Sequence, residues 1–185
     1  MTMVREAVAQ NTLIALPTGT GKTLIAAVVL KAHLRWFPNG MCVFLAMTRP
    51  LVNQQIESCR RAVGIGPDET MLMTGEEQPA SRAKKWREAS EPWTQRRLIF
   101  CTPHVLKNDI EKGLVDPRRF VCAIFDEAHH ATSAKSTYGI VARQIREAGG
   151  RCRVLALSAT AGSTLAKVQA VIDMLHISAV CVRTE

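Results

Sequence analysis

Short, almost entirely apolar runs alternate with amphipathic segments along nearly the whole chain, and this alternation restricts the possible fold more than any other feature of the sequence. A strand buried on both faces of a parallel sheet is apolar throughout, whereas a helix that covers the sheet is apolar along one side only. The sequence therefore predicts an α/β fold with a mostly parallel central sheet and helices on both of its faces.

The expected elements can be placed from this pattern and from the Gly and Pro residues that interrupt it. Strands are predicted at residues 12–16, 41–46, 97–101, 120–125 and 153–157, with weaker candidates at 70–73 and 179–182. Helices are predicted at residues 22–36, 51–63, 80–89, 104–112, 137–148 and 164–175. The polar stretch 74–93, with Arg82 among its basic residues, is expected to expose a solvated basic face. No linker interrupts the pattern, so residues 1–185 are expected to form one domain.

Composition limits the classes of protein to which the chain can belong. Hydrophobic residues make up 47% and charged residues 22% of the sequence, a balance that excludes disordered and collagen-like chains. The net charge of +8 favours a polyanionic partner, but it does not distinguish nucleic acid from a membrane surface. The scattered cysteines and the lack of a membrane-spanning apolar stretch lead us to expect reduced thiols in a soluble, intracellular protein that does not bind membranes.

A glycine-rich turn follows the first predicted strand and leads directly into a long helix. Glycines let the backbone turn sharply and point several N–H groups at one anion, while the helix dipole adds positive potential. Lys22 is expected to reach the β- and γ-phosphates of a nucleoside triphosphate, and the Thr23 hydroxyl is expected to bind Mg²⁺. The predicted nucleotide-binding residues are Pro17, Thr18, Gly19, Thr20, Gly21, Lys22 and Thr23.

Two adjacent carboxylates, Asp126 and Glu127, follow the buried run 120–125. They are expected at the carboxyl end of a central strand, where open α/β sheets bind their ligands. Asp126 can hold Mg²⁺ opposite Thr23, directly or through water. Glu127 is then placed to orient and deprotonate an attacking water. Taken alone, the pair could equally be an Asp that caps the N-terminus of a helix and an exposed Glu next to it. In a chain that also has the phosphate loop, we expect Lys22, Asp126 and Glu127 to be the catalytic residues.

These motifs together resemble those of superfamily 2 helicases. The shared features are a phosphate loop with Leu16 in place of its first glycine, the Asp-Glu-Ala-His box at residues 126–129, and Ser158-Ala159-Thr160. Their order and spacing are similar to those of the first RecA-like lobe, which is an ATP-binding P-loop domain. Longer strings, at residues 16–30, 35–38, 50–55 and 155–159, resemble the subfamily of the Fanconi anaemia group M protein, its fungal DNA-helicase counterparts and the archaeal Hef helicase–nuclease.

The resemblance implies contacts with a nucleic-acid backbone. Thr48, Arg49 and Pro50 match one motif that makes such contacts in relatives, and Thr102 matches another. Hydroxyls, an arginine and free N–H groups after strand ends contact phosphates without reading sequence, and the aromatic content of only 5% fits that mode of binding. For Thr48 and Thr102, the alternative is a hydroxyl that caps a turn.

The resemblance also implies that one lobe is not the whole motor. Coupling of nucleotide state to movement between lobes is the implied role of His129, Ser158 and Thr160. Relatives carry a glutamine for adenine recognition at a position that would precede Met1 here, and they have a second lobe with arginine fingers. Because an arginine finger adds several orders of magnitude to the rate of phosphoryl transfer, the first lobe alone is expected to be a weak or inactive ATPase.

The expected function is therefore the lobe that binds ATP and Mg²⁺ in an ATP-dependent DNA helicase or translocase, of the kind that serves DNA repair. Its expected partners are branched or single-stranded DNA, favoured over RNA, and the second lobe of the same protein. The expected location is the nucleus of a eukaryote or otherwise the cytoplasm. One alternative is an RNA helicase or RNA-sensing ATPase. The other is a nucleotide-dependent binding module without hydrolysis, against which the intact Glu127 argues.

Overall fold

The central sheet is parallel throughout, and its strands are those predicted from the sequence. The computed structural model describes residues 2–92, 94–159 and 164–183, and within them seven strands form one sheet in the order β3-β4-β2-β5-β6-β1-β7. Each pair of neighbouring strands is parallel. The predicted fold class is confirmed. The strands are β1 (Thr12–Ala15), β2 (Met41–Leu45), β3 (Thr70–Met73), β4 (Leu98–Cys101), β5 (Phe120–Phe125), β6 (Arg153–Ser158) and β7 (Ala179–Val182).

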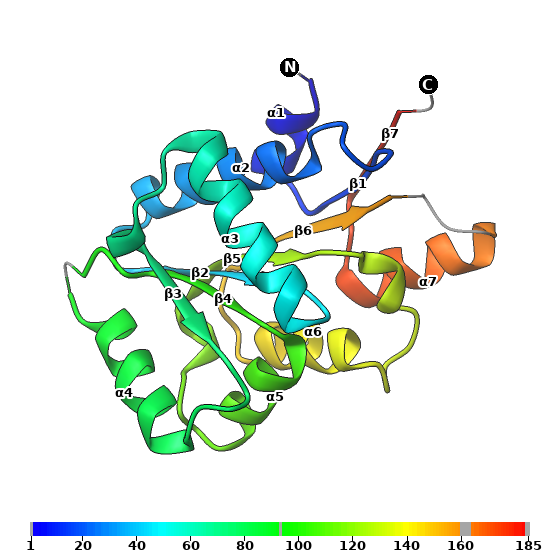
Figure 1. Ribbon diagram of the computed structural model, residues 1–185. Helices are drawn as coiled ribbons and strands as arrows, with labels where there is room; N and C mark the ends of the chain where they lie inside the picture. Colours follow the sequence, from blue (N-terminus) through cyan, green and yellow to red (C-terminus); the bar gives the residue numbers. More distant parts are fainter. Residues whose placement is uncertain (1, 93, 160–163, 184–185) are drawn as a thin grey trace.

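Helices cover both faces of the sheet, as Figure 1 shows. One face carries α1 (Thr2–Ala9), α2 (Lys22–Trp36) and α3 (Arg49–Val63). The other carries α4 (Pro79–Ser90), α5 (Pro103–Glu111), α6 (Thr137–Glu147) and α7 (Leu165–Leu175). Successive strand residues enter opposite hydrophobic clusters, for example Leu13 on the α4–α7 face and Ile14 on the α1–α3 face. Burial on both faces is the reason that the strands are apolar at nearly every position.

The strand order brings the ends of distant strands together. β1 lies between β6 and β7, and Ala15 is level with Ser158 on one side and Val182 on the other. β6 in turn separates β1 from β5. Because all the strands point the same way, the segments that follow β1, β2, β4, β5 and β6 open at one edge of the sheet, which is the edge where α/β folds bind ligands.

Helix α1 was not predicted from the sequence. It mixes charged and apolar residues over only eight positions, and isolated helices of that length are unstable in water. Its stability comes from packing against α2, which buries Ala7 completely. Short 3-10 helices at Pro67–Glu69, Pro117–Arg119 and Ala128–His130 were also not predicted.

The prediction of a solvated basic face for residues 74–93 was wrong at Arg82. This side chain is 5% exposed, and its Nε donates to both carboxylate oxygens of Asp109, at 3.0 and 2.9 Å. The indole nitrogen of Trp86 donates to the same carboxylate at 2.9 Å. A charged side chain is buried in this way only when it is paired. The pairing was not visible in the sequence, because Asp109 belongs to α5 and Arg82 to α4.

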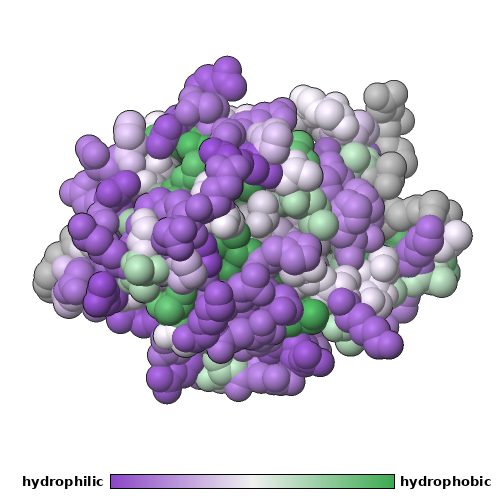
Figure 2. All heavy atoms as spheres, turned by 60° about the horizontal axis from the view of Figure 1, so that its bottom comes forward, coloured by the Kyte–Doolittle hydropathy of each residue, from purple (hydrophilic) through white to green (hydrophobic). Residues whose placement is uncertain are grey.

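The face of the molecule shown in Figure 2 is mainly polar. Figure 2 brings forward the side of the molecule at the bottom of Figure 1, and hydrophilic side chains cover most of it, with separate hydrophobic areas between them. Among the described residues, no helix combines the length and the hydropathy needed to cross a lipid bilayer.

Candidate functional site

The predicted phosphate loop connects β1 to α2 and turns sharply at two glycines. Gly19 has φ 83° and Gly21, the N-cap of α2, has φ 103°. This left-handed conformation costs residues with a side chain about 1–2 kcal/mol. The Thr20 hydroxyl donates to the Pro17 carbonyl at 2.6 Å, which closes the turn. The loop leads directly into the N-terminus of α2, where the first N–H groups of a helix and its dipole favour an anion.

Lys22 is the first residue of α2 and bonds back across the loop. Its Nζ donates to the carbonyl of Leu16 at 2.7 Å and to the carbonyl of Pro17 at 3.2 Å. The next residue, Thr23, donates its hydroxyl proton to Oε1 of Gln55 at 2.9 Å. The positive charge of Lys22 and the hydroxyl of Thr23 thus lie side by side at the start of α2.

The two predicted carboxylates follow β5. Asp126 is 5% exposed, and this burial together with the charge of Glu127 raises the pKa of its carboxyl to about 6. The Glu127 N–H, the charge of Lys22 and a hydrogen bond from Gln55 act in the opposite direction. Glu127 is half-buried and has φ 49° and ψ 50°, a left-handed conformation that is unusual for a residue other than glycine. Local strain of this kind occurs most often at functional sites.

The loop and the carboxylates meet around one cleft of about 540 Å³. Its size lies within the range of pockets that bind cofactor-sized molecules. The lining combines the positive charge of Lys22 with the carboxylates of Asp126 and Glu127. The cleft is lined by Thr18, Gly19, Gly21, Lys22 and Thr23 of the loop, by Leu51, Gln54, Gln55 and Ser58 of α3, and by Asp126 and Glu127.

The contribution of α3 to this cleft was missed in the sequence analysis. Gln55 accepts the hydrogen bond from Thr23 and donates through Nε2 to Oδ2 of Asp126 at 2.9 Å. The residue lies on the inner side of α3, where Val52 and Cys59 are buried three positions before it and four positions after it. A polar side chain at helical spacing within an apolar stripe was the available signal.

Of the predicted coupling residues, Ser158 lies between the loop and the carboxylates. It ends β6, is 3% exposed, and accepts the Leu16 N–H at its carbonyl at 3.1 Å. Its hydroxyl has no hydrogen-bond partner within the described part of the chain. His129 is exposed, and its Nδ1 lies 3.3 Å from a carboxylate oxygen of Glu127. Thr160 lies outside the described residues.

The residues predicted to contact a nucleic-acid backbone follow two adjacent strands, β2 and β4. Thr48 and Thr102 are the N-caps of α3 and α5, but neither side chain makes a capping hydrogen bond, so the capping alternative is not supported. Arg49 and Thr102 both line a groove of about 210 Å³. Arg49 also forms an exposed ion pair with Glu76, which lines the same groove. Pro50 is exposed in the first turn of α3.

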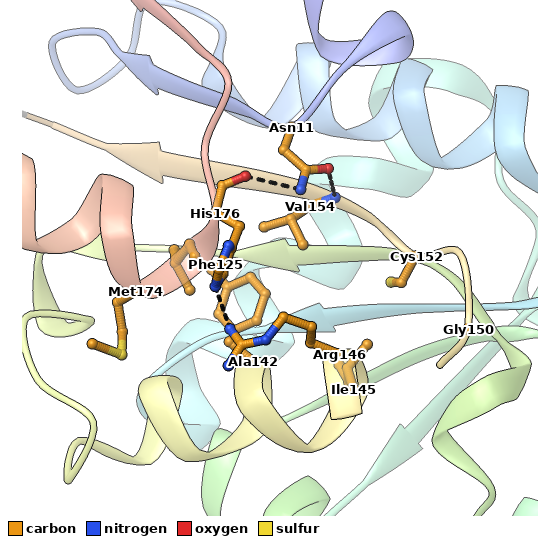
Figure 3. A pocket seen from close by; sticks show the side chains of 11 residues that line it. Asn11, Phe125, Ala142, Ile145, Arg146, Gly150, Cys152, Val154, Met174 and His176 are labelled. Atoms are coloured by element: carbon orange, nitrogen blue, oxygen red, sulfur yellow. Dashed lines mark hydrogen bonds between the residues drawn. The ribbon is translucent and has the colours of Figure 1, made fainter. Parts of the chain in front are cut away.

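A smaller cavity of about 100 Å³ lies on the other face of the sheet, between α6, α7 and the start of β6 (Figure 3). Asn11 lies beside it, donates to the His176 carbonyl at 3.0 Å and accepts the Val154 N–H at 3.0 Å. These bonds tie the start of β6 to the turn that precedes β7. Among the described residues that line this cavity, none was predicted to be functional, and the candidate site remains the larger cleft.

Comparisons with known proteins match nearly the whole chain. The family described as type III restriction enzyme, res subunit, matches residues 3–163. The ATP-dependent DNA helicase MPH1 of Pyricularia oryzae is 45% identical over 183 residues, which cover 99% of this chain and 16% of that protein. An Arabidopsis thaliana protein named DEAD-box ATP-dependent RNA helicase FANCM is 44% identical over 183 residues, covering 99% of this chain and 13% of its own length.

Among solved structures, the helicase domain of Pyrococcus furiosus Hef is similar, with a TM-score of 0.86 and 33% identity. The match covers 98% of this chain and 37% of the Hef chain. This chain spans 13–22% of the length of the curated relatives it matches. The predicted resemblance is confirmed, and the chain belongs to the type III restriction enzyme res-subunit family, with the fold of the first RecA-like lobe of a superfamily 2 helicase.

Proposed function

We propose that this chain is the ATP-binding lobe of an ATP-dependent DNA helicase or translocase that acts on branched or single-stranded DNA. The observation that carries the proposal is the meeting of the loop after β1 with the carboxylates after β5 around one cleft of about 540 Å³. The names of similar proteins, such as the ATP-dependent DNA helicase MPH1, support the same function.

The groups in the cleft have distinct chemical tasks. Lys22 would bind the β- and γ-phosphates, because an ammonium group bonds more strongly to a phosphate oxygen than to the neutral carbonyls that it contacts in this structure. Glu127 would orient the attacking water and accept its proton. The backbone N–H groups between Thr18 and Thr23 would hold the remaining phosphate oxygens.

The residues present fit a magnesium ion. Thr23 and Asp126 offer a hydroxyl and a carboxylate, which are oxygen ligands of the kind that Mg²⁺ prefers. Both groups contact the same amide, that of Gln55, so they lie on one side of the cleft. When bound, Mg²⁺ would offset charge on the β- and γ-phosphates during hydrolysis.

The groove beside α3 and α5 would hold the backbone of the nucleic acid. Thr48, Arg49, Pro50 and Thr102 all lie at the edge of the sheet where the nucleotide cleft opens. The ion pair of Arg49 with Glu76 is exposed, and exposed pairs contribute little free energy, so a phosphate group can replace the carboxylate. Contacts of this kind hold a strand without reading its sequence.

A second lobe would complete the motor. The similar proteins are several times longer than this chain, which leaves room in them for such a lobe. Ser158 and His129, together with Thr160, would transmit the state of the nucleotide to that lobe. Without arginine fingers supplied from it, hydrolysis by the first lobe alone would be slow. The corresponding location is the nucleus in a eukaryote and the cytoplasm otherwise.

DNA is favoured over RNA because more of the similar proteins are named as DNA helicases, although the Arabidopsis relative is named as an RNA helicase. The test is the ATPase activity of the full-length protein with branched DNA, single-stranded DNA or double-stranded RNA. Stimulation by DNA, abolished in Glu127→Gln, is the expected result. Stimulation by RNA alone would favour the RNA helicase, and nucleotide binding without turnover on any polymer would favour a non-hydrolysing module.

A further inference from the structure

Gln55 is the one side chain in the described part of the cleft that bonds to both of the groups expected to hold the cation. Its Oε1 accepts from the Thr23 hydroxyl and its Nε2 donates to Oδ2 of Asp126, each at 2.9 Å. The ionised carboxylate has no proton to donate, so the amide NH₂ group must face Asp126 and the amide oxygen must face Thr23. The chemistry of the two partners therefore fixes the orientation of the amide.

This arrangement decides where the lone pairs of both partners point. A threonine hydroxyl can donate one hydrogen bond, and in Thr23 this bond goes to Oε1 of Gln55. The lone pairs of the Thr23 oxygen therefore remain free for a cation. Asp126 accepts from Gln55 at Oδ2 and from the Glu127 N–H at Oδ1, at 3.1 Å. Each carboxylate oxygen retains acceptor capacity, while both hydrogen bonds hold the plane of the carboxylate in place.

We propose that Gln55 is a positioning residue for the divalent cation, which holds the Thr23 hydroxyl and the Asp126 carboxylate in the orientation that binding of a metal–nucleotide complex requires. The inference rests on the proposed function, because it takes the cleft to be the site of a nucleotide and its cation. Gln55 does not contact the cation or the nucleotide in this proposal. Groups that orient metal ligands in this way typically contribute about 10- to 100-fold to metal affinity.

A purely structural role for Gln55 predicts a different result. The side chain is half-buried on the helix that packs against α2, so its loss could weaken the packing of the cleft as a whole. In that case, nucleotide binding would fall equally with and without the cation. A positioning role instead predicts that only the cation-dependent part of the binding is lost.

The experiment compares the affinity for a non-hydrolysable ATP analogue in Mg²⁺ and in EDTA, measured by calorimetry. Gln55→Met keeps a similar volume but removes both hydrogen bonds, and Gln55→Ala repeats the test with a smaller side chain. Asn53→Ala is the matched control, since this exposed amide side chain lies on the same helix, two positions before Gln55, but does not line the cleft. The Mg²⁺-to-EDTA affinity ratio is expected to fall about 10-fold or more in both Gln55 variants and to stay unchanged in Asn53→Ala.

The outcomes separate the inference from the proposed function. If the unaltered protein binds the analogue and the Gln55 variants retain its Mg²⁺-to-EDTA ratio, the positioning role is wrong and the proposed function stands. An equal loss of affinity in Mg²⁺ and EDTA would also overturn it, in favour of packing. If the unaltered protein binds no nucleotide under either condition, the proposed function fails and the inference fails with it.

Discussion

The ammonium group of Lys22 lies 2.7 Å from the carbonyl oxygen of Leu16, so the charge at the start of α2 is bonded to the residue that directly follows β1. A second bond reaches the carbonyl of Pro17 at 3.2 Å. Both acceptors are neutral, whereas hydrogen bonds between an ammonium group and an ionised acceptor are shorter and about twice as strong. Lys22 is thus held at the cleft by groups that a phosphate can displace.

Replacement of Lys22 by Ala is expected to weaken ATP binding by about 10- to 100-fold, the range that corresponds to the loss of a hydrogen bond with a charged group. Calorimetric titration measures this change. Lys31→Ala is the matched control, because Lys31 lies on the same helix and also donates to a carbonyl, that of Val63, away from the cleft. Unchanged affinity in Lys22→Ala would contradict the assignment of the phosphate loop.

Substitutions at Gly19 and Gly149 can distinguish an effect on the stability of the fold from an effect on nucleotide binding by the loop. Their φ angles are 83° and 81°, and an added Cβ would meet no atom within 4 Å at either position. Each Gly→Ala substitution is therefore expected to lower the free energy of unfolding through backbone strain alone, by about 1–2 kcal/mol. Chemical denaturation measures this loss. Only Gly19→Ala should also weaken nucleotide binding, and an equal weakening in Gly149→Ala would show that strain acts globally.

The buried ion pair between Arg82 and Asp109 is expected to matter much more than an exposed one. Asp109→Asn leaves the guanidinium buried without its counter-charge, which should lower the free energy of unfolding by about 3–5 kcal/mol. Asp116→Asn breaks the exposed pair with Arg118 and should have a far smaller effect, because water already solvates both of those charges. Urea denaturation of the two variants gives the comparison, and similar losses would contradict it.

The buried side chain of His33 is expected to make the free energy of unfolding depend on pH. The side chain is 4% exposed, and this burial, with a smaller contribution from the charge of Arg153, lowers the pKa of His33 below its ordinary value of 6.5 despite a hydrogen bond with the Val29 carbonyl. Well above pH 6.5 the imidazole is neutral in both the folded and the unfolded chain. Below that pH, the unfolded chain binds the proton more readily, so the free energy of unfolding should fall until the lowered pKa of the folded state is reached.

Urea denaturation between about pH 7.5 and about pH 5.5 measures how steeply the free energy of unfolding changes with pH, and His33 is expected to contribute to this slope. His33→Gln should reduce the slope, while the same substitution at the exposed His104 should leave it in place. An identical slope in His33→Gln and the unaltered protein would rule out this histidine as its source.

Local sequence patterns were sufficient to predict most of the fold. β5 and α2 were predicted with the bounds that the structure shows, because the apolar run of one and the glycine turn before the other are local signals. α1 was missed because its stability depends on contact with α2, which no property of residues 2–9 reveals. The burial of Arg82 was missed for a similar reason, since it depends on a partner in another helix.

In the candidate site, too, features formed by residues close in the sequence were predicted, and a contact between distant residues was not. Gly19, Lys22 and Thr23 lie within five consecutive residues, so their spacing predicted that they share one loop, and the structure places them together along the cleft. The bridge through Gln55 of α3 joins Thr23 of α2 to Asp126, which follows β5, and these three residues are far apart in the sequence. Spacing carries no information about such a contact, although a polar residue on the buried side of α3 marked the position as unusual.

The position of β1 between β6 and β7 has a consequence for synthesis of the chain. The residues of the phosphate loop are translated before both of the strands that flank β1, since these strands follow residue 152. Contacts between segments so distant in sequence form slowly, and a nascent chain that lacks these strands offers β1 no neighbour in the sheet. The loop after β1 can therefore take its final place only after β6 and β7 have left the ribosome.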